Sequence, residues 1–149
     1  SDPTYAQDMI AADNYCAFRI AASNGLIPAM QLMIELDREH VHDMIAENDY
    51  QAFRLAAENG QIKAMELIMA SDPEHIHDMI AAGHYAGFLW AAENGHIKVM
   101  KLIMASDPEH IHDMVAANHY WAFRLAAENG HIEPMELMIA SDPQHAHNM

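Results

Sequence analysis

Apolar positions return in the same order every 35 residues along this chain, which predicts a tandem-repeat protein. The string Ala-Ala-x-Asn-Gly occupies residues 21–25 and recurs at 56–60, 91–95 and 126–130 without insertion. A phenylalanine stands three residues before each string, and a methionine stands five residues after each glycine. A fixed period of this length indicates a solenoid, in which each unit buries its apolar face against the next unit.

Each unit begins with a pattern typical of a short helix. Residues 71–74, Ser-Asp-Pro-Glu, predict a helix start, with Ser or Asp as the capping side chain and proline in the first turn. Ile76, Met79 and Ile80 follow at the spacing of one helical face. We expect this helix to end at Gly83, because glycine tolerates the left-handed conformation of a helix end. The equivalent residues, Asp13, Asn48 and Asn118, also tolerate it better than most.

Two further helices complete the predicted unit. The second runs from about Tyr85 to Glu93 and stops at Asn94-Gly95, and the third runs from about Ile97 to Ala105. No segment alternates with the period of a strand, so the sequence predicts an all-α tandem-repeat solenoid of about four 35-residue helical repeats. Residues 1–149 form a single array, with units at approximately 1–35, 36–70, 71–105 and 106–140 and a partial unit at 141–149.

Two strings of the repeat resemble the ankyrin repeat. Phe-Arg-Leu-Ala-Ala-Glu-Asn-Gly at 53–60 and Gly-His-Ile-Lys-Val-Met-Lys-Leu-Ile at 95–103 are similar to that family's "L-H-x-A-A-x-x-G-H-x-x-V-V-x-L-L" pattern. The resemblance implies stacked helical pairs and, as function, protein–protein recognition through a concave face. The family's Thr-Pro pair is absent, and helix-like residues 72–82 replace its β-hairpin. Divergent arrays of this kind are found in proteins of intracellular bacteria and large viruses.

This resemblance favours a protein-interaction module that is part of a larger intracellular or effector-type protein. Its location would then be the cytoplasm, or the host cytosol if the source is an intracellular bacterium or virus. The near-identity of the copies leaves an alternative, an engineered or recently duplicated scaffold without an evolved partner.

Net charge limits the kinds of partner that this chain suits, and its cysteine content indicates the compartment. The chain has 22 acidic and 7 basic residues, a formal net charge of −15, and its bases are scattered along the sequence. Nucleic acids and anionic membranes attract clustered Lys and Arg, so both are disfavoured, whereas a protein partner with a basic surface is favoured. The single cysteine, Cys16, cannot form an internal disulfide, which favours a reducing compartment.

Histidine is the residue type that most suggests a metal site in this sequence. A His-x-His pair recurs at 40/42, 75/77, 110/112 and 145/147. Residues i and i+2 of a helix point about 200° apart, and equivalent residues of stacked units lie about 10 Å apart, whereas zinc–nitrogen bonds measure about 2 Å. We therefore interpret the histidines as structural or solvated, with a metal-binding His-rich protein as the alternative. The sequence has no nucleophile motif or phosphate loop, so we predict no enzyme activity and no cofactor.

Positions that differ between the copies indicate where a partner binds. On the second helix the residues opposite the phenylalanine form an outward stripe that contains both tryptophans, Trp90 and Trp121. We predict that the partner-binding residues surround these indoles: His84, Leu89, Trp90, Glu93, His119, Trp121, Leu125 and Glu128. The alternative interpretation is that Trp90 only fills the space left by the small residues Ala86 and Gly87.

Overall fold

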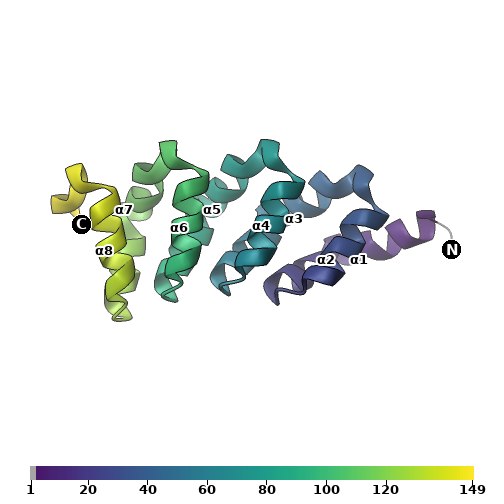
Figure 1. The fold of residues 1–149 in the computed structure, drawn as a ribbon, viewed down its shortest axis with the longest axis horizontal. Coiled ribbons are helices and arrows are strands. Elements are labelled where there is room, and N and C mark those ends of the chain that lie inside the picture. The colour runs from purple at the N-terminus through teal and green to yellow at the C-terminus, as the bar shows by residue number, and fades with distance from the viewer. Residues whose placement is uncertain (1–2) are drawn as a thin grey trace.

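The computed structural model describes residues 3–149, and over this range the chain is all-α, as predicted. Four long helices alternate with four short ones along an elongated array (Figure 1). A 3-10 helix follows each short helix, at Arg38–His40, Pro73–His75, Pro108–His110 and Pro143–Asn148. The α-helices are α1 (Pro3–Ser23), α2 (Ile27–Leu36), α3 (Val41–Glu58), α4 (Ile62–Ser71), α5 (Ile76–Glu93), α6 (Ile97–Ser106), α7 (Ile111–Glu128) and α8 (Ile132–Ser141).

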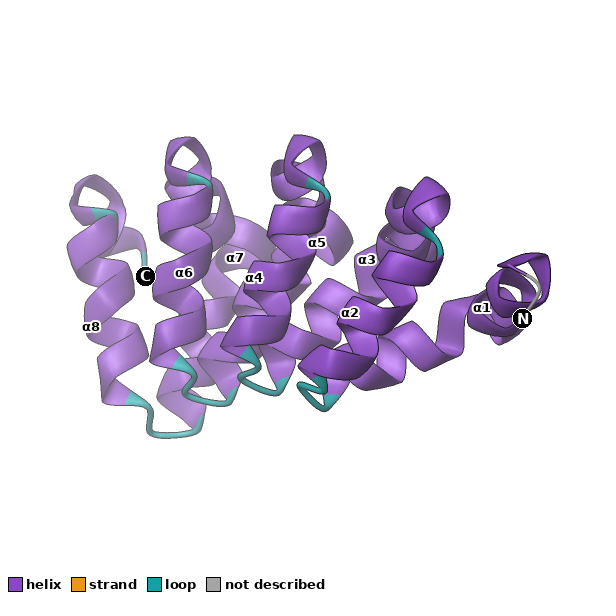
Figure 2. Ribbon diagram, turned by 45° about the vertical axis from the view of Figure 1, so that its right-hand side comes forward, coloured by secondary structure: helices purple, strands orange, loops and turns teal. Residues whose placement is uncertain are grey.

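The helices form two layers that run the length of the array. The long helices α1, α3, α5 and α7 pack side by side, and α2, α4, α6 and α8 lie over them (Figure 2). Each short helix packs against the long helix that precedes it. This arrangement confirms the solenoid, because the main contacts between helices join elements of the same or adjacent units. None of the helices within residues 3–149 is long and apolar enough to cross a membrane.

Each long helix is interrupted at the predicted stop. In α5, Ala82 is extended, and Gly83, His84 and Tyr85 follow with φ angles of 65°, 58° and 65°. The predicted end at Gly83 is therefore confirmed, and the right-handed helix resumes at Ala86, one residue later than expected. A left-handed conformation costs a residue with a Cβ about 1–2 kcal/mol, so these turns need compensating contacts.

An arginine supplies these contacts in three of the four long helices. Arg54 Nε donates to the carbonyl of Asp49 at 2.9 Å, and its Nη2 donates to that of Asn48 at 2.8 Å. Arg19 and Arg124 donate to the equivalent turns. In α5, Leu89 stands in place of the arginine, and there the turn begins with glycine, the residue that adopts positive φ most readily.

The predicted capping role of Ser71 and Asp72 is wrong, because neither side chain caps the helix that follows. Ser71 Oγ donates back to the carbonyl of Leu67 at 2.7 Å, so it belongs to the end of α4. The side chain of Asp72 makes no capping bond either, and only its carbonyl accepts from the His75 amide, at 3.1 Å. The Asp72 carboxylate instead accepts hydrogen bonds from two imidazoles, which occupy both of its oxygens.

The core consists of the repeated apolar positions between the two layers. Phe18, Phe53 and Phe88 are fully buried, as are Met30, Met65 and Met100. The ring of Phe53 lies beside Gly87 of the next unit, 3.7 Å from where a Cβ at Gly87 would be. Phe123 is only partly buried, because α7 is the last long helix within residues 3–149 and has a long helix on one side only.

Candidate functional site

The two tryptophans meet across the junction between α5 and α7. The ring centroids of Trp90 and Trp121 lie 6.1 Å apart with an interplanar angle of 66°, an edge-to-face contact. Trp121 is 38% exposed and Trp90 is partly exposed. Such aromatic pairs contribute about 0.5–1.5 kcal/mol in addition to the energy of the area they bury. The contact therefore holds the two indoles together as one apolar patch on this surface.

The other predicted partner-binding residues differ in their solvent exposure. His84 and His119 are exposed, and both belong to left-handed turns. Glu128 is also exposed, while Glu93 and Leu125 are partly buried. Leu89 is only 3% exposed and offers almost no surface to a partner, although the arginines at the same repeat position are more exposed.

The atoms nearest to Gly87 come from the preceding unit. A Cβ at Gly87 would meet Ala57 at 3.4 Å and Phe53 at 3.7 Å. The atoms nearest to a Cβ at Gly87 thus come from the core side of α5. Ala86 itself is buried, at 7% exposure.

A second feature, a cluster of two histidines and one aspartate, recurs at three unit junctions. Asp72 Oδ2 accepts from Nδ1 of His42 on α3, and its Oδ1 accepts from Nδ1 of His75, both at 2.8 Å. The two imidazole rings face each other with centroids 4.1 Å apart. The same contacts join His77, Asp107 and His110, and His112, Asp142 and His145. We call these the His–Asp–His clusters.

Sequence reasoning missed these clusters because it considered the two histidines of one pair and the equivalent histidines of successive units, but not the first histidine of one pair with the second of the preceding pair. The residues that meet are not equivalent, since His42, the second histidine of its pair, contacts His75, the first histidine of the next pair, 33 positions later. The aspartate that stands three residues before the first histidine of each pair has the position expected of a helix cap, but it binds histidines instead. The repeated Asp-x-x-His-x-His string at residues 72–77 was the available clue.

The clusters perturb the acidity of their members. Burial raises the pKa of Asp72, but the hydrogen bonds from His42 and His75 outweigh it and hold that pKa below its usual value. The hydrogen bond to Asp72 in turn raises the pKa of His75, and the equivalent bond to Asp107 raises the pKa of His110.

The stability of the array should fall as the pH rises from 6 to 9. The pKa of His75 and that of His110 are raised, so their contribution to stability is complete below the unfolded value of about 6.5 and is lost as the pH passes the folded values. The pKa values of Asp72 and Asp107 are lowered, so their contribution is lost only when the pH falls well below about 4. Urea unfolding at pH 6 and pH 9 measures the difference.

The double variant His75→Gln/His110→Gln isolates the clusters from the general effect of net charge. Its stability should change less between pH 6 and 9 than that of the wild type. The control variant His84→Gln/His119→Gln removes two exposed histidines outside the clusters and should retain the wild-type pH dependence. Equal pH dependence in all three proteins would contradict the prediction.

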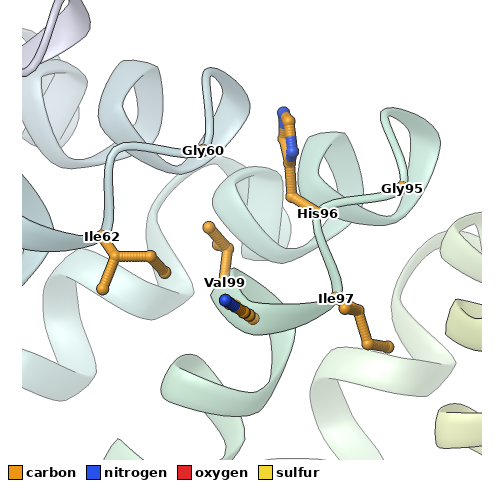
Figure 3. A pocket seen from close by; sticks show the side chains of 7 residues that line it. Gly60, Ile62, Gly95, His96, Ile97 and Val99 are labelled. Carbon is orange, nitrogen blue, oxygen red and sulfur yellow. The ribbon is translucent and has the colours of Figure 1, made fainter.

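A shallow open hollow lies between the turns that join the helices of adjacent units. Figure 3 shows His96 rising beside Gly60, with Ile62, Ile97 and Val99 around the floor. The lining residues are mostly apolar, with His96 and Lys98 as the ionisable ones. Enclosed sites with several convergent polar groups are typical of small-molecule binding, and this hollow lacks both properties.

Comparison with known proteins supports the repeat assignment. No protein-family model matches the sequence, and no curated protein matches it. Among solved structures, an ankyrin repeat family protein from Legionella pneumophila matches with a TM-score of 0.75 and 34% sequence identity. The match covers 89% of this chain and 40% of that protein, so the chain corresponds to less than half of its neighbour's length. The 35-residue period, the stacked helical pairs and this structural neighbour together place the chain among the ankyrin-like repeat proteins.

Proposed function

We propose that this chain is a protein-binding module and that its partner docks on the surface around Trp90 and Trp121. The observation that carries the proposal is the edge-to-face pair of partly exposed indoles at the α5–α7 junction. Tryptophan is strongly enriched among the residues that dominate binding energy at protein interfaces. The ankyrin-like fold supports the same role, since stacked repeats present an extended surface without an enclosed pocket.

The chemistry around the indoles defines the partner. Glu128 is exposed and Glu93 partly exposed on the same two helices, and the chain carries a net charge of −15. A partner segment with an apolar side chain beside a lysine or arginine suits this surface, because the cation gains contact with both the carboxylates and the indole faces. The proposal includes no catalytic step.

Trp90→Ala and Trp121→Ala should each weaken partner binding at least tenfold while lowering the melting temperature by only a few degrees, because each indole is partly solvent-exposed in the free chain and their mutual contact contributes about 0.5–1.5 kcal/mol. Proteins retained by the immobilised chain from cell lysate are identified first, and the dissociation constant of the strongest binder is then measured for each variant. Circular dichroism follows the melting temperature in parallel.

Ile20→Ala is the matched control, because Ile20 occupies the repeat position of Trp90 on α1 and is 53% exposed. It removes an exposed apolar side chain from the same face, two units away, and should leave binding unchanged. If the tryptophan variants destabilise the fold by several kcal/mol and show no separate loss of binding, the indoles are packing residues and the proposed surface is wrong.

A further inference from the structure

We propose that the three His–Asp–His clusters are binding sites for a divalent transition metal ion of the Zn²⁺ class, one at each of three unit junctions. In each cluster two imidazole nitrogens and one carboxylate oxygen lie within 4.8 Å of one another. The donors come from both sides of a junction, since His42 lies on α3 while Asp72 and His75 lie between α4 and α5. A bound ion would therefore join adjacent units.

The distances suit a small ion after modest side-chain movement. Zinc binds histidine nitrogen at about 2.0–2.1 Å and carboxylate oxygen at about 2.0–2.2 Å, which places the ligand atoms of a tetrahedron roughly 3.3 Å apart. The Nδ1–Oδ distances in the three clusters are 2.7–3.0 Å. Rotations that separate each pair by a few tenths of an ångström make room for the ion, and the partly exposed imidazoles have space to rotate.

The imidazoles and the carboxylate of a cluster can exchange their hydrogen bonds for bonds to a metal ion without a change in total charge. A neutral imidazole carries its proton on either nitrogen, so Nδ1 becomes a metal ligand when the proton moves to Nε2. The Asp72 side chain is 9% exposed and ionised at neutral pH, so it supplies a negative charge held in a fixed orientation. Its charge offsets one of the two positive charges of the ion.

The donor set selects the class of metal. Two imidazoles and one carboxylate suit Zn²⁺, Ni²⁺ or Cu²⁺, whereas Ca²⁺ and Mg²⁺ require six or more oxygen ligands. Three protein ligands leave a fourth position for water, as in many zinc sites with an open coordination position. One imidazole of each cluster is exposed and the other is half-buried, which places that position near the protein surface.

The first junction provides an internal comparison. Asp37 Oδ1 accepts from His40 Nδ1 at 2.8 Å, but the position equivalent to His42 is Gln7. This junction thus lacks one imidazole of the donor set. The full chain should bind three Zn²⁺ ions rather than four.

The test is a titration of the whole chain, stripped with a chelator and dialysed, with ZnCl₂ at pH 8 by isothermal calorimetry. We expect three equivalents of Zn²⁺ and a rise in melting temperature, because an ion that binds only the folded chain stabilises it. CaCl₂ should give neither. Absence of saturable Zn²⁺ binding would overturn the proposal and leave the clusters as hydrogen-bonded links between units.

Variants identify the ligands. His77→Gln copies the residue at the first junction and should reduce the stoichiometry from three to two, and His42→Gln/His77→Gln/His112→Gln should weaken Zn²⁺ binding at least tenfold. The control variant His84→Gln/His119→Gln keeps all three clusters and should bind three ions. If the triple variant fails to fold, the three single variants decide the question. Unchanged stoichiometry in the single variants would show that Zn²⁺ binds elsewhere and would refute the assignment.

Discussion

Phe53→Ala should lower the free energy of unfolding by about 3–5 kcal/mol, the range measured when a buried phenylalanine is truncated. Phe53 is fully buried, and its ring lies beside Gly87 of the following unit. Glycine has no side chain that can move into the space, so the cavity left by the ring will persist. The substitution removes contacts on both sides of one junction. Urea unfolding followed by far-UV circular dichroism measures the loss.

Phe123→Ala is the matched control for this prediction. Phe123 occupies the same repeat position on α7, but it is only partly buried, because α7 is the last long helix of the described residues 3–149. The same atoms are removed, with less burial to lose, so its effect should be clearly smaller. Equal losses in the two variants would contradict the conclusion that stacking of the next unit stabilises each phenylalanine.

Gly95→Ala should destabilise the array by at least about 2 kcal/mol, for two reasons that add. Gly95 has a φ of 73°, a left-handed conformation that costs alanine about 1–2 kcal/mol. A Cβ at this position would also lie 2.8 Å from Nδ1 and 3.1 Å from Cγ of His131 in the next unit. The base of the imidazole must move to relieve this contact, and overpacking of this kind costs roughly 1–3 kcal/mol.

Gly130→Ala separates the two causes. Gly130 has the same φ of 73°, but a Cβ there would meet no atom within 4 Å. This variant should therefore show the conformational cost alone. The difference between the two variants measures how tightly His131 packs over the preceding turn. A Gly130→Ala variant as unstable as Gly95→Ala would mean that the inter-unit contact contributes nothing.

The helical content and the interruptions were predictable because they depend on local chemistry repeated four times. The stops at Asp13, Asn48, Gly83 and Asn118 follow from the few residue types that tolerate positive φ. The structure adds that the left-handed turn continues through the following tyrosine, which local preference disfavours. Three arginines that donate to the turn carbonyls compensate, and pairing an arginine with a turn five or six residues earlier is not visible in helical periodicity.

The surface around the tryptophans was only partly predictable. Periodicity placed Trp90 and Trp121 on the outward side, and the edge-to-face contact follows once α5 and α7 are stacked. The prediction also included Leu89, because it replaces the arginine of the other units next to the indoles, but the structure buries it. Spacing within one helix does not show which of its positions the neighbouring units cover, because that depends on how the units pack.

The sequence by itself determined the repeat, the helical units, the core phenylalanines and methionines and the acidic surface, because each depends on spacing within one unit. Only the tertiary structure decided which residues of different units meet. The offset between stacked units brings His42 to Asp72 and His75, rather than to its own equivalent 35 residues later. That offset depends on how α3 and α5 pack together, which is why the His–Asp–His clusters emerged only from the assembled array.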